Sequence, residues 1–468
     1  MGAVTTSPPQ RATDRTRRTD LAWLAALTIA VRIPSYLADR HLTFDDGVFG
    51  ASAVAMRAGG QPFRDVFSSQ GPLFLPLVWT ADLLGLRTTN APRLLSMVAA
   101  LLLVGATYVA GRAITDRGGA VRAAGLVSIT ATSLWITGPL AADGTALAFA
   151  TATVAAALCW RGEITLRRAL WLGLGVGATI SVKALLAPVI LPVALVLLAT
   201  RRVGLILAGA STAVAFHMVL WVPWGPGNVW AQSYEYHLDV ATDRTPGANL
   251  AKVFSTMGDR DLIVLVAVAL AIGAALLGRR AFPPMPEARL CSPDILLGVW
   301  IAGTVLVLLS EHPMWRPHVS QLVPAMALLS ARHRPPGRLL LVAAALVIPY
   351  HVVHAWPVLN PTGYSESAER VVEQLAALPE GALAISDDPG LVWRAGRRTP
   401  PDLVDASILR IETGELTAES VAAAAADPAV CAVAVRSAVR WGSFDDLPER
   451  LAALGYEVVD EDDQGNRL

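Results

Sequence analysis

Apolar runs of helix length alternate with short polar loops through the first 356 residues of the chain. Because a helix needs roughly 20 apolar residues to cross a bilayer, we predict about eleven transmembrane helices. Their ranges are 21–38, 94–112, 121–140, 144–160, 168–183, 184–200, 203–223, 261–278, 293–310, 318–331 and 339–356. The stretch 168–200 also fits a single interrupted crossing.

The loop between the first two predicted spans, residues 39–93, is too long for a tight turn and is not polar throughout. Residues 47–57 and 73–86 have helix-length apolar character, and glycine and proline residues punctuate the chain between them. We therefore predict two short interfacial helices that lie along the membrane surface. A second long loop, 224–260, is rich in aromatic residues, as is typical of a membrane interface.

The pattern changes after residue 356. Helical segments are predicted at 366–378, 416–426 and 447–454, and they alternate with short apolar strands at 381–386 and 430–435. Alternating strands and helices indicate a small α/β domain. Its span, 357–468, is long enough for a hydrophobic core of its own.

Composition supports a polytopic α-helical membrane protein. The chain is 54% hydrophobic and 16% charged, with a mean hydropathy of +0.48, whereas soluble domains carry roughly 25% charged residues. Three cysteines, Cys159, Cys291 and Cys431, show no pairing or metal-binding spacing, so we expect neither disulfides nor a thiolate metal site. No P-loop, dinucleotide fingerprint, nucleophile elbow or nucleic-acid-binding surface is found.

Basic residues fall in alternate loops, as the positive-inside rule predicts. The clusters are Arg11 to Arg18; Arg112, Arg117 and Arg122; Arg161, Arg167 and Arg168; Arg201 and Arg202; Arg279, Arg280 and Arg289; and Arg332, Arg334 and Arg338. We therefore expect a multi-pass protein of the cell (plasma) membrane, with the tail 1–20 in the cytoplasm. Loop 39–93 and the domain 357–468 would be extracytoplasmic. A single crossing at 168–200 would move the last two clusters outside, so two helices are favoured.

Two adjacent acids, Asp45 and Asp46, follow the first span. Because hydrocarbon penalises charge, acids at a membrane boundary suggest a function. A carboxylate here could accept a proton from an acceptor hydroxyl, hold a divalent metal (Mg or Mn) or stabilise a developing oxocarbenium ion. The alternative is that Asp46 caps a helix at 47–57. A metal is compatible with this pair but not required.

Two further charged residues are predicted at the same membrane face. Asp143 lies between the spans 121–140 and 144–160, where it would contribute to a site or cap the second helix. Lys183 is the only lysine before residue 250 and lies at the break in 168–200. It suits a phosphate counter-ion, or it is a lysine that extends to the interface from a helix end.

The third outer-face cluster runs from Glu311 to Pro324. Arg316, His312 and His318 could bind a lipid phosphate or an acceptor, or they could be solvated residues of an interfacial loop. The histidines lack the spacing of a zinc motif.

The order of these motifs resembles the GT-C superfamily of polyprenyl-phosphate-sugar-dependent transferases. The nearest branch is family 39, which contains protein O-mannosyltransferases and aminoarabinose transferases of bacteria. The resemblance rests on Phe44-Asp45-Asp46, Pro62-Phe63-Arg64-Asp65, Gln70-Gly71-Pro72-Leu73, Arg93, Asp143-Gly144-Thr145, the 175–183 run and 318–324. Asp387-Asp388-Pro389, Ala395-Gly396-Arg397 and Asp405 are similar to the appended domain of many bacterial members.

The resemblance implies roles for individual residues. Asp45 would be the base that activates the acceptor, with Asp46 as its partner and Asp143 as an acid of the same cavity. Lys183, Arg316 and His318 would face the donor phosphate, and Gln70 and Arg93 would be substrate-binding positions. Family members often have Lys-Pro-Pro-Leu where this chain has Gln70-Gly71-Pro72-Leu73, so a lysine expected at the donor phosphate is absent there.

We therefore predict a membrane glycosyltransferase, a hexosyl- or pentosyltransferase of the cell envelope. It would move a sugar from a polyprenyl-phosphate donor to an extracytoplasmic lipid, glycan or protein acceptor, with inversion. The alternative is a flippase, transporter or non-catalytic membrane protein that handles lipid-linked sugars. Transporters of this size often contain repeated halves and polar midplane residues, and neither is evident here.

Overall fold

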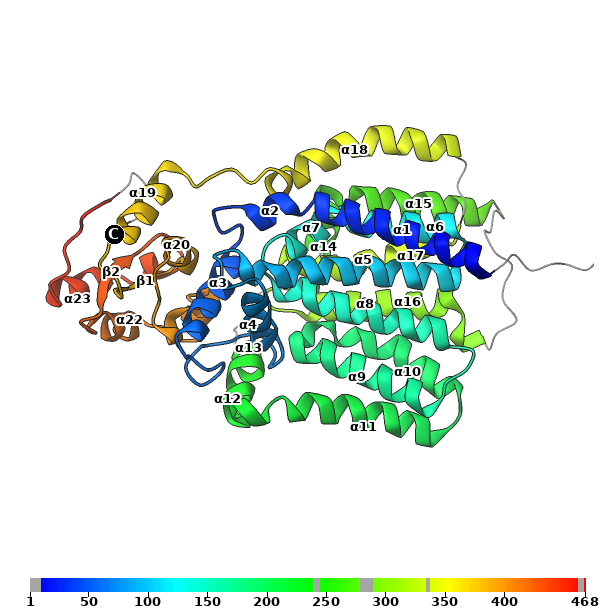
Figure 1. The fold of residues 1–468 in the computed structure, drawn as a ribbon, viewed down its shortest axis with the longest axis horizontal. Coiled ribbons are helices and arrows are strands. Elements are labelled where there is room, and N and C mark those ends of the chain that lie inside the picture. Colours follow the sequence, from blue (N-terminus) through cyan, green and yellow to red (C-terminus); the bar gives the residue numbers. More distant parts are fainter. Residues whose placement is uncertain (1–9, 239–244, 278–288, 334–336, 462–466) are drawn as a thin grey trace, which may run out of the picture.

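The computed structural model describes residues 10–238, 245–277, 289–333, 337–461 and 467–468. A bundle of long helices occupies one end of the molecule, and a smaller part built from the C-terminal residues occupies the other (Figure 1). Helices α3 (Phe44–Arg57) and α4 (Phe74–Leu84) lie between the two. Each predicted span and each predicted interfacial helix corresponds to helical structure. The placement of α3 and α4 along a membrane surface stays a prediction.

The bundle consists of the helices expected from the apolar runs. Their bounds are α1 Gln10–Ala30, α2 Ile33–Leu37, α5 Leu94–Ile114, α6 Arg117–Ile129, α7 Ala131–Thr137, α8 Ala142–Trp160, α9 Leu166–Val182, α10 Ile190–Ala199, α11 Val203–Val219, α15 Leu262–Leu276, α16 Pro293–Ser310, α17 Val323–Ala331 and α18 Gly337–Leu359. Among the described residues, five helices are long and apolar enough to cross a membrane. A bent pair raises this to six. The number of eleven crossings stays a prediction.

Two predicted spans are interrupted. The run 21–38 is divided into α1 and α2, and Pro34 lies in the first turn of α2, where its missing amide hydrogen costs nothing. The run 121–140 is divided into α6 and α7, which bend by 62°. Asp261, buried between α14 (Pro246–Arg260) and α15, accepts hydrogen bonds from the backbone amide (3.2 Å) and hydroxyl of Thr132. It thereby satisfies an amide that the start of α7 leaves unpaired.

The stretch 168–200 forms two helices, as the charge pattern favoured. The backbone of Lys183 is extended (φ −154°, ψ 115°) and ends α9, and a 3₁₀ segment, Ala184–Val189, leads into α10. The outer loop attaches to this break, because the amides of Gly71 and Leu73 donate to the carbonyls of Val182 (3.0 Å) and Ser181 (2.9 Å). Residues near position 70 are thus held beside Lys183.

Lipid-facing character is clearest at the edges of the bundle. Helices α11 and α18 expose large apolar side chains, among them Leu207, Val214, Leu341 and Leu346. Apolar residues that would be unfavourable in water suit contact with acyl chains. The exposure of these two helices therefore supports a bilayer around the bundle.

The C-terminal elements match the predicted α/β pattern. They are α19 Glu366–Ala376, β1 Leu383–Ser386, α20 Pro389–Arg394, α21 Ile408–Glu412, α22 Ala418–Ala425, β2 Val430–Ala434 and α23 Leu447–Ala453. Strands β1 and β2 pair in parallel, with Leu383 opposite Val430 and Ser386 opposite Ala434. A parallel pair needs a long crossover, which α20, α21 and α22 provide.

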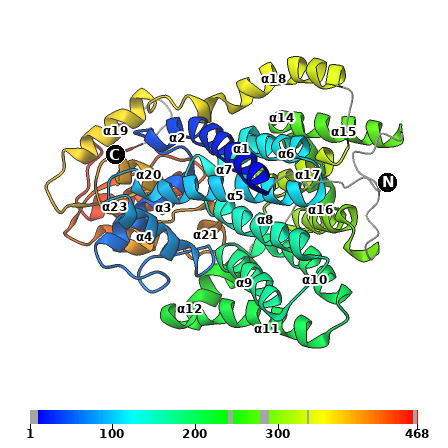
Figure 2. The same ribbon diagram turned by 45° about the vertical axis from the view of Figure 1, so that its right-hand side comes forward.

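Helix α20 packs directly on α3, the helix that begins with the acidic pair. Two glycines of α3 permit this contact: a Cβ at Gly47 would lie 2.7 Å from the Cα of Gly390, and one at Gly50 would lie 2.3 Å from the ring of Trp393. Both views show the C-terminal elements beside α3 and α4 (Figures 1 and 2). The C-terminal part therefore borders the region of Asp45.

Candidate active site

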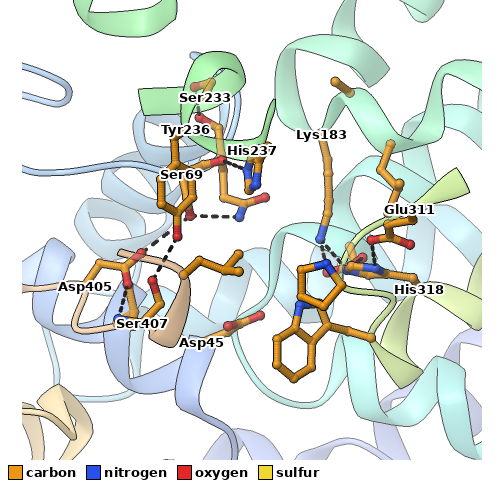
Figure 3. Close-up of a pocket in the computed structure, with 18 of the residues that line it drawn as sticks. Asp45, Ser69, Lys183, Ser233, Tyr236, His237, Glu311, His318, Asp405 and Ser407 are labelled. Atoms are coloured by element: carbon orange, nitrogen blue, oxygen red, sulfur yellow. Dashed lines mark hydrogen bonds and ion pairs between the residues drawn. The ribbon is translucent and has the colours of Figure 1, made fainter. Parts of the chain in front are cut away.

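A cavity of about 740 Å³ opens where the bundle, the outer loops and the C-terminal part meet. Five of the predicted site residues line it: Asp45, Gln70, Asp143, Lys183 and His318. The sequence separates these residues by up to 273 positions, and four different parts of the fold bring them together. Figure 3 shows the cavity with its polar side chains.

Lys183 is the centre of a polar cluster on one side of the cavity. Its ammonium donates to Asp143 Oδ2 (2.8 Å) and to His318 Nε2 (3.0 Å). An imidazole that accepts at Nε2 carries its proton on Nδ1, and Nδ1 contacts a carboxylate oxygen of Glu311. Asp143 Oδ1 lies 3.7 Å from His318. Two carboxylates thus fix the positions of the lysine and the histidine.

Helix ends position this cluster. Lys183 projects from the break after α9, and Asp143 is in the first turn of α8, where the helix dipole favours an acid. His318 lies in the 3₁₀ segment Arg316–Leu322. The cap position of α8 is Ala141, so Asp143 does not act as the cap.

Asp45 faces the cavity without a fixed partner. Within the described part of the chain, no hydrogen bond or ion pair within 4 Å reaches its carboxylate. Figure 3 shows it between the Lys183 cluster and a second group of polar residues. Its oxygens are open to the cavity, but the surrounding walls limit their hydration. Burial raises the pKa of Asp45 to about 6, although the charge of Lys183 works in the opposite direction.

Asp46 does not lie in the cavity, and its predicted catalytic role lacks structural support. Both of its carboxylate oxygens are engaged: Oδ1 accepts from Arg93 Nε (3.1 Å) and the amide of Leu140 (2.9 Å), and Oδ2 accepts from Arg93 and the amide of Leu42 (2.9 Å). Nor does Asp46 cap α3, because the side chain of Thr43 does. The acidic pair is thus divided between two environments.

Arg93 is a structural partner of Asp46. It is 1% exposed, and its other N–H groups donate to the carbonyls of Ser35 (2.9 Å), Ala38 (2.8 Å) and Arg40 (2.5 Å). With all these bonds made inside the protein, Arg93 does not reach the cavity. The structure therefore does not support its prediction as a substrate-binding residue.

Replacement of Asp46 by alanine should destabilise the protein far more than replacement of Asp45. Removing one partner of a buried ion pair leaves the other charge uncompensated and costs about 3–5 kcal/mol. We expect purified Asp46→Ala to lose its folded fraction at a clearly lower temperature than Asp45→Ala. The measurement is size-exclusion chromatography in detergent after graded heating. Equal midpoints for the two variants would contradict the structural role.

Of two other predicted binding residues, Arg316 and Gln70, only Gln70 lines the cavity. Arg316 does not line the cavity: it is half exposed and lies 3.8 Å from Asp259, which is also half exposed. Such surface pairs contribute little. Gln70 does line the cavity, and its amide donates to Ser69 Oγ (3.1 Å). The structure thus separates Arg316 from the Lys183 cluster and keeps Gln70 near it.

A metal held by Asp45 and Asp46 together does not fit this geometry, since the oxygens of Asp46 are already engaged. Within the described residues, no group of three or more histidine, cysteine, aspartate or glutamate side chains is arranged to hold a metal ion.

Several cavity residues were not identified as site residues from the sequence. They are Ser69, Tyr236, His237, Glu311, Asp405, Ser407 and Arg440. Glu311 belongs to the run 311–324, in which the sequence points to the basic residues. The aromatic density of 224–260 predicts an interfacial belt, yet Tyr236 and His237 line the cavity. Only the family resemblance points to Asp405, and no local pattern marks Arg440.

Comparisons with known proteins identify the fold. No protein-family model matches the chain, and no curated protein matches it in sequence. The structure of ArnT from Cupriavidus metallidurans bound to undecaprenyl phosphate is similar, with a TM-score of 0.63, 15% identity and coverage of 96% of this chain and 97% of that one. Its apo state gives a TM-score of 0.60 at 14% identity, with 97% of this chain and 98% of that one covered.

A second similar structure is the oligosaccharyltransferase AglB from Archaeoglobus fulgidus, in complex with an inhibitory peptide and a dolichol-phosphate. The TM-score is 0.55 and the identity 12%, and 90% of this chain and 69% of that one are covered. Both neighbours are GT-C glycosyltransferases. At these identities the likeness concerns the fold, and this chain therefore has a GT-C-type fold.

Proposed function

We propose that the chain is a membrane glycosyltransferase that moves a sugar from a polyprenyl-phosphate donor to an extracytoplasmic acceptor. One observation carries the proposal: a single cavity contains an unpaired carboxylate, Asp45, and a lysine held in place by an acid, Asp143, and a histidine, His318. The fold adds support, because the solved neighbours bind undecaprenyl phosphate and dolichol-phosphate.

Lys183 is the proposed partner of the donor phosphate. An ammonium has three donors, and Asp143 and His318 take two of them. These two contacts fix the ammonium group, so the direction of its third N–H donor is also fixed. A preorganised cation stabilises charge that develops on a leaving group without reorganisation during the reaction. Glu311 acts indirectly, through the contact of its carboxylate with the imidazole of His318.

Asp45 is the proposed general base. In the transfer, the acceptor oxygen forms a bond to the anomeric carbon while the bond from that carbon to the phosphate oxygen breaks. The acceptor proton passes to Asp45, and the electron pair leaves with the polyprenyl phosphate. A single displacement of this kind inverts the anomeric centre. A carboxyl whose pKa is near 6 is both ionised at neutral pH and a stronger base than an ordinary aspartate.

The membrane arrangement follows from the same proposal. The cavity is lined by residues of α3 and of the segment before α21, and α3 lies beside the C-terminal elements at one end of the bundle (Figure 2). The charge pattern predicts this end to be extracytoplasmic, with the protein multi-pass in the cell membrane. A lipid-linked donor would then keep its chain in the bilayer and its head group at the cavity. The donor is proposed to carry a hexose or pentose, and the acceptor to be an envelope lipid, glycan or protein.

The test is conversion of a defined donor by the native protein in proteoliposomes. We expect release of undecaprenyl phosphate from labelled undecaprenyl-phosphate-mannose or -arabinose when a delipidated cell-envelope extract is supplied as acceptor. Protein-free liposomes with the same extract provide the background. Translocation of the labelled lipid across the liposome membrane without any conversion would contradict the proposal and favour a flippase.

A further inference from the structure

The cavity has a second polar side, away from the Lys183 cluster. We call it the polar wall, and it consists of Ser69, Tyr236, His237, Asp405 and Ser407. These residues come from the outer loop, from α13 (Tyr236–Leu238) and from the segment just before α21. In Figure 3 the polar wall and the Lys183 cluster lie on opposite sides of Asp45. The polar wall would therefore contact a different part of a bound ligand than Lys183 does.

Asp405 is a buried carboxylate with unused accepting capacity. It is 4% exposed, and its Oδ1 accepts from the amide of Ser407 (2.9 Å). The Oδ2 atom has only a long contact of 3.5 Å to Ser69 Oγ, and no ion pair reaches Asp405 among the described residues. An ionised carboxylate can accept about four hydrogen bonds, and a buried one is costly unless they are made. A ligand in the cavity that donates hydrogen bonds to the carboxylate of Asp405 would therefore stabilise it.

Tyr236 and His237 add uncharged groups to the same wall. The hydroxyl of Tyr236 lies 3.1 Å from Ser407 Oγ, and burial raises the pKa of this phenol, so it remains protonated. Burial also lowers the pKa of His237, which keeps its ring neutral. Its Nε2 must donate to the carbonyl of Ser69 (3.0 Å), which leaves Nδ1 as an acceptor. The wall therefore offers both donors and acceptors, one negative charge and no positive charge.

This chemistry suits a sugar and not a phosphate. The anionic Asp405 would repel a phosphate, whereas neighbouring hydroxyls of a sugar ring can each donate to a carboxylate oxygen. The cavity volume of about 740 Å³ is within the range of small-molecule sites, roughly 300–1,000 Å³, and leaves room for a ring beside the phosphate. A donor whose phosphate lies at Lys183 would extend its sugar past Asp45 toward the wall.

We propose that the polar wall binds the hydroxyls of the donor sugar and selects the sugar, with Asp405 of the C-terminal part as its main contact. This inference rests on the proposed function, since it assumes a polyprenyl-phosphate-linked sugar in the cavity. Sites that hydrogen-bond a substrate hydroxyl reject analogues without it, because their buried polar groups are then left unpaired. Asp405 and Tyr236 are thus specificity-determining residues.

The test compares the affinities of three lipids in detergent: undecaprenyl phosphate, undecaprenyl-phosphate-mannose and undecaprenyl-phosphate-arabinose. We expect the native protein to bind at least one sugar-bearing lipid more tightly than the bare lipid. In Asp405→Asn and Tyr236→Phe this preference should fall by about tenfold, with the affinity for undecaprenyl phosphate unchanged. In Lys183→Ala all affinities should fall together and the preference should remain.

Asp402→Asn is the matched control, because Asp402 is exposed on the same segment and does not line the cavity. It should retain the native preference. The inference is overturned if Asp405→Asn and Tyr236→Phe keep the native preference, or if the native protein binds the bare and sugar-bearing lipids equally. In both cases the proposed function stands. Failure of the native protein to bind any of the three lipids overturns the proposed function together with the inference.

Discussion

Replacement of Asp45 by asparagine is expected to lower the rate of sugar transfer by at least about 100-fold, the usual contribution of a general base. Asparagine has nearly the same shape but cannot accept the acceptor proton. Because Asp45 makes no hydrogen bond or ion pair among the described residues, the protein should fold and bind donor as before. The measurement is release of undecaprenyl phosphate from labelled donor at saturating donor concentration.

Asp65→Asn is the control for this loss. Asp65 belongs to the same outer loop and accepts from the amide of Gln61 (2.8 Å), but it does not line the cavity. Its transfer rate should be close to native. The pH profile gives a second criterion: a base with a pKa of about 6 is inactive when protonated, so the native rate should rise through pH 6 and then level off. Native-like transfer by Asp45→Asn would eliminate Asp45 as the base.

Replacement of Lys183 by alanine should reduce transfer by a comparable factor, about 100- to 1,000-fold, because it removes the cation that stabilises the departing phosphate. Unlike Asp45→Asn, it should also weaken the binding of undecaprenyl phosphate itself. Loss of binding together with loss of rate therefore distinguishes the phosphate site from the base. Both quantities can be measured on one preparation in detergent.

Arg316→Ala provides the comparison for Lys183→Ala. Arg316 has the right charge and lies only two positions before His318, but its side chain pairs with Asp259 at the surface. We expect its transfer rate to remain within about twofold of native, as for most exposed ion pairs. A large loss in Arg316→Ala with a small one in Lys183→Ala would reverse the assignment of the phosphate site.

Hydrophobic patterning predicted the helices of the bundle well. Apolar composition over 15 to 20 residues is a strong local signal, and the structure does break the helix at Lys183, although the two crossings that the charge bias favoured stay a prediction. The bend between α6 and α7 was missed, because the side chain that stabilises the start of α7 is distant in sequence. Asp261 satisfies the start of α7 from 129 positions away. Local periodicity contains no trace of such a partner.

The site was predicted only in part, because the sequence shows local patterns but not contacts between distant segments. Asp45, Asp143, Lys183 and His318 each stand out as polar residues at the ends of apolar runs, so their positions alone were informative. The sequence did not show that Asp45 faces the cavity while Asp46 is paired inside the protein. Adjacent residues on a helix point about 100° apart and can therefore lie in different environments. Arg93 is paired with one of them and not the other. The polar wall escaped prediction because three separate segments build it.

The contact between α3 and α20 limits which segments can be exchanged between this protein and related chains in a chimera. Gly47 and Gly50 leave α3 with a flat face that fits Gly390 and Trp393 and no bulkier surface. A chimera that imports residues 366–468 alone would bring a foreign α20 onto this face and shift the first turn of α3, where Asp45 lies. The smallest exchangeable unit is therefore α3 together with the C-terminal part, although more than 300 residues separate them in the chain.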